Sequence, residues 1–335
     1  SVFIIVSGFV ITHLRLTRPE PWVTYIGRRF LRLFPVYAVC MAAAIALSPL
    51  YAMAYIDSGI AFGTEMRAAR LASEADQLPL HLLLHVSMIH GAVPDTVLPY
   101  AGSAFLAPAW SLSLEWQFYL IAPALFSLLA LRGLTTLMLS VGALALVQLL
   151  LTRQTAVDWQ YDSLFFLASG YFLIGMLCRI AIERIARQES PFEYLLLAMI
   201  LMLSVDRLAA VLWLIWFGIV LYEAGYMRIE SRLFRRLVQA VAFDPRLARL
   251  GQWSYATYLA HIPVFSLLVG GYGMSAGAGA INQEIAALIV ISSFPMIVLI
   301  SAGLHRHVEL PAIRLGKIGL QNKRYTKVTE PTVPK

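Results

Sequence analysis

The chain has 335 residues, of which 59% are hydrophobic and only 13% are charged, and its mean hydropathy is +0.73. A soluble domain of this length would carry about a quarter charged residues, so the composition excludes an ordinary soluble protein and leaves no room for a second, soluble domain. The net charge is +7, but the basic residues do not alternate with aromatic residues in a stripe. We therefore expect no nucleic-acid partner, and basic loops that contact anionic lipid instead.

Apolar segments separated by charged residues predict about nine membrane-spanning helices. Runs of about 18 to 20 apolar residues match a hydrocarbon core of ~30 Å, and a helix satisfies its own backbone polar groups there. The predicted fold is an all-α, polytopic transmembrane helix bundle over residues 1–315, followed by a polar tail, 316–335, that we expect to be loosely ordered. The predicted spans are 1–13 (partial), 33–53, 105–131, 134–151, 162–180, 192–206, 208–226, 252–271 and 285–305.

The positively charged residues predict how these helices are oriented. If the loop 13–32 is cytoplasmic and the loops alternate from there, 22 of the 26 Lys and Arg residues lie on the cytoplasmic side. Lys and Arg are enriched in cytoplasmic loops, so this partition predicts a multi-pass protein with a cytoplasmic C-terminus.

One predicted outer loop, residues 54–104, is unusually long and contains three histidines, His81, His85 and His90. Long loops in compact proteins are commonly functional or disordered. The spacing of His81 and His85 is compatible with metal binding, but no third ligand stands at a recognisable distance, so we predict an interfacial helix and no metal site. The glycine-rich segment 270–280 lacks a phosphate-loop pattern and predicts a flexible outer loop.

The first polar cluster, RRFLRLFP, lies where a cytoplasmic loop meets a span. Arg29 and Arg32 are three residues apart and share a helix face. An ordinary positively charged anchor is one interpretation of this cluster. A clamp for phosphate groups is the other, because Arg presents a rigid fork of donors.

The second cluster, WSLSLEWQFYL, opens a long apolar helix and places Glu115 one to two turns inside it. A structural cap or ion pair near the interface would explain this carboxylate, but burying it in a span is costly, and the cost favours a functional role. Its polar and aromatic neighbours are candidate substrate-binding residues: Trp110, Ser111, Ser113, Gln117 and Tyr119.

The third cluster, LGQWSYATYLAHIPV, places Ser254, Tyr258 and His261 on one helical stripe, with Tyr255 beside it. A stripe with a single histidine is more often a satisfied packing network than a catalytic one. His261 is nevertheless a candidate general base, and the other three residues are candidate binding residues.

Taken in order, these clusters resemble the motifs of the acyltransferase-3 family of integral-membrane O-acyltransferases. The opening FIIVSGFVIT resembles the family's second-helix signature, and the closing HVELP resembles its Glu-x-Pro motif, here Glu309 and Pro311. The resemblance runs from residue 1 to about 315. It implies ten helices, acyl-CoA as the cytoplasmic donor substrate, no bound cofactor, and an extracytoplasmic or lipid-linked carbohydrate or glycolipid as acceptor. We find no match to the family's first helix, which carries an Arg and a His taken to be catalytic, so we expect this chain to be inactive without that segment.

The resemblance therefore predicts an acyltransferase, of the class transferring groups other than amino-acyl groups, in the plasma (bacterial inner) membrane. The transferred group would be acetyl or a longer acyl chain, the phosphates of the donor would lie at Arg29 and Arg32, and Glu115 would orient the catalytic imidazole. A transporter or flippase for a glycolipid or polysaccharide precursor is the alternative, since it would also be a polytopic bundle with ionisable residues inside the membrane. Against it, the sequence lacks paired broken helices and repeated halves.

Overall fold

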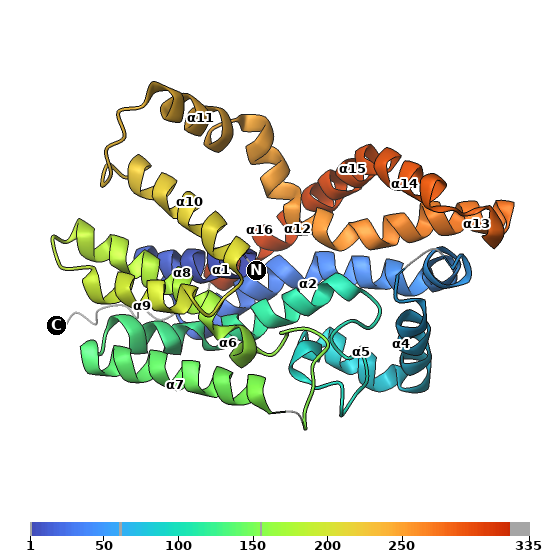
Figure 1. Ribbon diagram of the computed structural model, residues 1–335, viewed down its shortest axis with the longest axis horizontal. Coiled ribbons are helices and arrows are strands. Elements are labelled where there is room, and N and C mark those ends of the chain that lie inside the picture. The colour runs from blue at the N-terminus through green and yellow to red at the C-terminus, as the bar shows by residue number, and fades with distance from the viewer. Residues whose placement is uncertain (1, 60–61, 155, 322–335) are drawn as a thin grey trace, which may run out of the picture. The chain divides into compact units, whose positions relative to one another are not determined.

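The computed structural model describes residues 2–59, 62–154 and 156–321, and within these residues it is helical without any β-strand (Figure 1). The all-α prediction is therefore confirmed, and each of the nine predicted spans overlaps at least one helix. Among the described residues, six helices are long and apolar enough to cross a membrane: Trp22–Ala46, Ala107–Ala130, Leu134–Arg153, Phe165–Ala186, Pro245–Ala276 and Phe294–Ile318. Three shorter apolar helices are Val2–Thr17, Phe192–Met202 and Gln283–Ser292.

The contacts divide the chain into two units, each with its own packing. The first unit comprises residues 1–20, 87–102 and 110–249. Its helices are α1 (Val2–Thr17), η2 (His90–Ala92), α6 (Trp110–Ala130), α7 (Leu134–Arg153), α8 (Phe165–Ala186), α9 (Phe192–Met202), α10 (Arg207–Glu223) and α11 (Arg232–Ala242).

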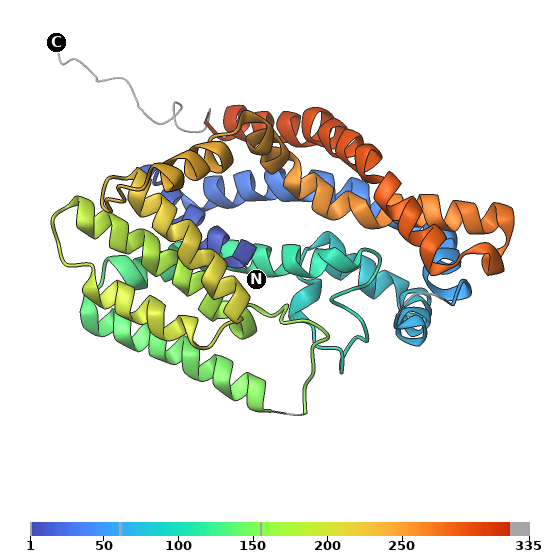
Figure 2. The same cartoon turned by 45° about the horizontal axis from the view of Figure 1, so that its top comes forward.

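Helix α8 is the centre of the first unit, because α1, α6, α7 and α9 all pack on it (Figures 1 and 2). Glycines allow α1 to lie unusually close. A Cβ on Gly8 would stand 2.2 Å from the carbonyl oxygen of Phe172, and a Cβ on Gly175 would stand 2.0 Å from that of Ile5. Small residues permit such close approach of helices in membrane proteins, where dispersion contacts replace the hydrophobic effect as the driving force. The close packing of α1 on α8 therefore depends on these two glycines.

The second unit comprises residues 21–86, 103–109 and 250–335, described to 321. Its helices are α2 (Trp22–Ala46), α3 (Ser48–Ala52), η1 (Met53–Asp57), α4 (Thr64–Asp76), α5 (Leu78–Val86), η3 (Ala107–Ala109), α12 (Pro245–Phe265, from residue 250 onward), η4 (Ser266–Gly270), α13 (Gly271–Ala276), η5 (Ala278–Ala280), α14 (Gln283–Ser292), α15 (Phe294–Leu304), η6 (His305–Glu309) and α16 (Leu310–Gln321).

In this unit α16 and η6 pack along α2, while α3 and η1 pack against η4. Gly270 of η4 permits the second contact, since a Cβ there would stand 2.1 Å from the carbonyl oxygen of Leu50. The long segment after α2 is not an open loop: α4 packs on η1 and on α5. It is therefore built on the end of α2 and can hold side chains in fixed positions.

The structure differs from the predicted segments in four places. Helix α2 begins at Trp22, directly after Pro21, and not at residue 33, because proline is well suited to the start of a helix. The predicted last span, 285–305, is interrupted at Ser293 between α14 and α15. The glycine-rich segment 270–280 contains the helices α13 and η5 instead of forming a loop throughout. Helix α16 continues to Gln321, so the beginning of the predicted loose tail is helical, while 322–335 lie outside the described residues.

Candidate functional site

Glu115 occupies the buried face of α6 in the first unit, where it is 7% exposed. Its Oε1 accepts a hydrogen bond of 3.0 Å from the Ser7 hydroxyl of α1 and another from the Tyr119 hydroxyl, one turn further along α6. Two hydroxyl donors on one oxygen complement the negative charge of a carboxylate. The predicted placement of Glu115 inside a helix was therefore right, and the sequence did not reveal Ser7 as its partner.

Ser113 and Gln117 connect α6 to neighbouring backbone. The Ser113 hydroxyl accepts from the Gly91 amide at 2.9 Å. The Gln117 side chain donates to the Ser163 carbonyl and accepts from the Phe165 amide, both at 2.9 Å. These bonds fix the segments before α6 and α8 around Glu115; a role of Ser113 and Gln117 in binding substrate stays a prediction.

Trp110 and Ser111 lie at the beginning of α6. The half-buried Trp110 ring stacks on Tyr161, with ring centroids 5.3 Å apart and an interplanar angle of 6°. Ser111 is buried on the same turn of helix. The aromatic pair joins the beginning of α6 to the segment before α8, and a role of Trp110 and Ser111 in binding substrate stays a prediction.

Arg29 and Arg32 lie within α2, so the predicted helix contains both, although it begins earlier than the predicted span. The Arg29 guanidinium is 5.9 Å from the centre of the Tyr25 ring, and Arg32 is exposed. Helix α16 runs alongside: a Cβ on Gly316 would stand 3.7 Å from Arg28 Cγ. One helix therefore carries the basic cluster, and its role as a phosphate clamp stays a prediction.

The third cluster lies on α12. Tyr255 donates a hydrogen bond of 2.6 Å to the Leu33 carbonyl and so joins α12 to α2. Tyr258 is exposed, with its ring 6.1 Å from that of the half-buried His261. Ser254 is exposed as well, and its hydroxyl donates to the Gly251 carbonyl. Tyr255 thus has a structural bond, while Ser254 and Tyr258 are the exposed members of the predicted stripe and His261 is half-buried.

The histidines of the long loop are buried in the second unit or beside α6. Helix α5 carries His85, whose Nδ1 lies 2.7 Å from the Tyr37 hydroxyl, and His81, whose Nε2 lies 3.2 Å from the Ser73 hydroxyl. Burial lowers the pKa of His81. Within the described part of the chain no three His, Cys, Asp or Glu side chains are grouped as a metal site would require. Sequence reasoning missed the Tyr37–His85 pair, since the two residues are far apart in the chain.

Comparison with known proteins identifies the family of this chain. A family model described as an acyltransferase domain, Acyl_transf_3, matches residues 1–306. The chain belongs to the acyltransferase-3 family. No curated protein and no solved structure matches the chain at a significant level. Membership and the apolar helices together make the chain a multi-pass membrane acyltransferase.

In this acyltransferase the closing motif also has a defined structure. Glu309 ends the π-helix η6 and is buried, and its Oε2 lies 2.9 Å from His305 Nδ1 one turn earlier. Since η6 packs on α2, the motif supports the helix that carries the arginine cluster.

Proposed function

We propose that this acyltransferase moves an acyl group, in the first instance acetyl, from cytoplasmic acyl-CoA to a hydroxyl of an extracytoplasmic or lipid-linked carbohydrate, in a bacterial inner membrane. The buried Glu115 with its two hydroxyl donors is the observation that carries the proposal. A carboxylate buried in an apolar helix is costly, and a purely structural bundle has no need for it. The family supports acyl transfer, while donor and acceptor follow from the resemblance of the motifs.

The reaction exchanges one acyl bond for another. The C–S bond of the thioester breaks, a C–O bond to the acceptor forms, and the hydroxyl proton passes to a base and then to the departing thiolate of coenzyme A. Glu115 is our candidate for holding that proton or for orienting the imidazole that does, because a carboxylate commonly positions a catalytic histidine. His261 is the candidate imidazole among this chain's own side chains.

Binding of the donor is the proposed role of Arg29 and Arg32. Their guanidinium groups lie on one helix, are permanently charged, and have the geometry to bind phosphate oxygens in pairs. Because salt screens the attraction between these guanidinium groups and the phosphates of coenzyme A, the affinity for acyl-CoA should fall as the salt concentration rises.

The test uses the protein expressed with any upstream sequence that its gene supplies, in membranes that contain acceptor glycans. Transfer of radiolabel from acetyl-CoA to glycan is compared for the unaltered protein, Glu115→Gln, His261→Gln and the control Glu223→Gln, in which an exposed carboxylate is changed. We expect at least a hundredfold loss with Glu115→Gln and no loss with Glu223→Gln, at equal abundance in the membrane. Full activity of Glu115→Gln would contradict the role of Glu115. Absence of labelled glycan and of thioester cleavage in every sample, together with export of a glycolipid, would favour the transporter instead.

A further inference from the structure

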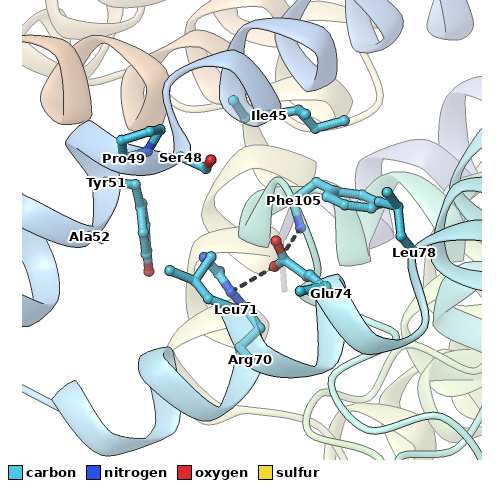
Figure 3. A pocket seen from close by; sticks show the side chains of 12 residues that line it. Ile45, Ser48, Pro49, Tyr51, Ala52, Arg70, Leu71, Glu74, Leu78 and Phe105 are labelled. Carbon is cyan, nitrogen blue, oxygen red and sulfur yellow. Dashed lines mark hydrogen bonds and ion pairs between the residues drawn. The ribbon is translucent and has the colours of Figure 1, made fainter.

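The second unit contains a cavity of about 370 Å³ that is separate in its lining from Glu115 and from the arginine cluster. It lies between the end of α2, α3 and α4 (Figure 3). Helix α4 belongs to the loop 54–104, which the charge distribution predicts to be on the outer side, and the other two elements end the predicted span 33–53 that leads into this loop. Its volume falls within the range of about 300 to 1,000 Å³ that is typical of small-molecule sites.

An ion pair forms one wall of this cavity. Arg70 and Glu74, one turn apart on α4, are 5% and 8% exposed, and Arg70 Nε lies 3.1 Å from Glu74 Oε1. The same Oε1 accepts from the Phe105 amide at 2.9 Å, and Arg70 Nη1 donates to the Ser103 carbonyl at 3.2 Å. Both side chains are therefore held in place by groups outside their own helix.

Part of the hydrogen-bonding capacity of this wall is unused. Within the described residues, Glu74 Oε2 and Arg70 Nη2 have no protein partner. The cavity therefore offers an acceptor and a donor side by side on one rigid turn. Figure 3 places Ser48, whose hydroxyl could supply a further contact, on the opposite side from this pair.

Two aromatic rings stand at the sides of the cavity. The Tyr51 ring lies 4.6 Å from the Arg70 guanidinium, and Phe105 lies opposite it in Figure 3. Phe105 has a φ of +56°, a conformation that costs a bulky residue roughly 1 to 3 kcal/mol and persists only when its surroundings impose it. This conformation accompanies the bond from the Phe105 amide to Glu74, so the strained residue takes part in building the wall.

The chemistry of the lining selects among ligands. A phosphate would be repelled by the carboxylate, and a cation by the guanidinium. A hydrocarbon chain would leave the two polar atoms buried and unsatisfied, which is unfavourable. A neutral diol matches both: one hydroxyl donates to Glu74 Oε2, the adjacent one accepts from Arg70 Nη2, and the apolar faces of a sugar ring contact Tyr51 and Phe105.

We propose that this cavity binds one neutral sugar residue of the acceptor through two vicinal hydroxyls. The proposal rests on the proposed function only in taking the acceptor to be a carbohydrate. It defines a binding site on the predicted outer side that is distinct from the residues proposed to act on the acyl group.

The experiment measures binding without requiring catalysis. Saturation-transfer NMR is recorded on the purified full-length protein in nanodiscs with methyl α-D-glucopyranoside, methyl α-D-mannopyranoside and methyl α-D-galactopyranoside, and with the 2,3-di-O-methyl derivative of the glucoside as ligand control. The protein variants are Glu74→Gln, Ala75→Trp, which fills the cavity from the exposed side of α4 and leaves the ion pair intact, and the control Glu65→Gln on the same helix. If Glu74→Gln fails to fold, Ala75→Trp decides the question.

We expect at least one glycoside to bind, its di-O-methyl derivative not to bind, and affinity to fall about tenfold or more in Glu74→Gln and Ala75→Trp but not in Glu65→Gln. Binding that survives both cavity variants would overturn the proposal, as would displacement of the glycoside by 1-octanol at equal concentration. Absence of glycoside binding in a protein that still cleaves acetyl-CoA would overturn the sugar site and leave the proposed function standing. If the unaltered protein transfers no acyl group but binds the glycoside, and Glu74→Gln weakens that binding, the proposed function is overturned and the sugar site stands.

Discussion

The hydroxyl of Ser7 on α1 donates to the carboxylate of Glu115 on α6 across 3.0 Å, although 108 residues separate them in the chain. This bond exists because Gly8, the next residue, lets α1 approach α8 until backbone atoms nearly touch. A contact between two helices thus determines the surroundings of the proposed catalytic carboxylate on a third.

Removal of either hydroxyl that donates a hydrogen bond to Glu115 should slow acyl transfer without weakening the binding of acetyl-CoA. In Ser7→Ala and in Tyr119→Phe we expect kcat for acyl transfer to fall about tenfold, because each loses one of the bonds that orient Glu115, while KM for acetyl-CoA stays unchanged. Steady-state kinetics in proteoliposomes measures both constants. A rise in KM at constant kcat would place these hydroxyls in donor binding instead.

The glycines at the α1–α8 contact should tolerate no larger side chain. Gly8→Ala and Gly175→Ala each introduce a Cβ within 2.2 Å of a carbonyl oxygen, so the helices must separate and we expect stability to fall by about 2 kcal/mol or more. Thermal unfolding in detergent, followed by size-exclusion chromatography, measures the loss. Gly142→Ala on α7 is the control: a Cβ there meets nothing within 4 Å, and alanine should be neutral or stabilising. Equal stability of all three variants would contradict the close packing.

Replacement of Arg29 or Arg32 by lysine should weaken the binding of acetyl-CoA even though the positive charge is kept. For Arg29→Lys and Arg32→Lys, which keep the positive charge but lose the paired donors, we expect KM for acetyl-CoA to rise about three- to tenfold. Arg18→Lys, an exposed residue of the preceding segment, is the control. A topology assay with cysteine labelling verifies that orientation is unchanged. Unaltered KM in both clamp variants would indicate that the cluster serves only as an anchor.

The hydrogen bond between α12 and α2 should contribute to stability more than to catalysis. Tyr255→Phe removes a donor from the Leu33 carbonyl, and we expect a loss of about 1 kcal/mol in unfolding free energy with kcat changed less than threefold. Denaturant titration of the purified protein measures the free energy of unfolding, and an acyl-transfer assay measures kcat. A large fall in kcat at unchanged stability would instead support the predicted role of Tyr255 in substrate binding.

The sequence by itself determined the all-α class, the helical segments and the positions of the three polar clusters along them. These follow from local physics: an apolar run must satisfy its backbone internally, and charged residues mark where it ends. Local signals were weaker at boundaries, so the start of α2 after Pro21 and the continuation of α16 to Gln321 were missed.

Only the tertiary structure decided which side chains meet. Ser7 was visible as a polar residue in an apolar run, and its partner was not, because the pairing depends on how closely Gly8 and Gly175 let two helices pack. The same holds for Tyr37 with His85, and for the wall that Arg70 and Glu74 build with the amide of Phe105. Helical periodicity specifies a face, whereas the partner of that face is set by shape complementarity between segments distant in the chain.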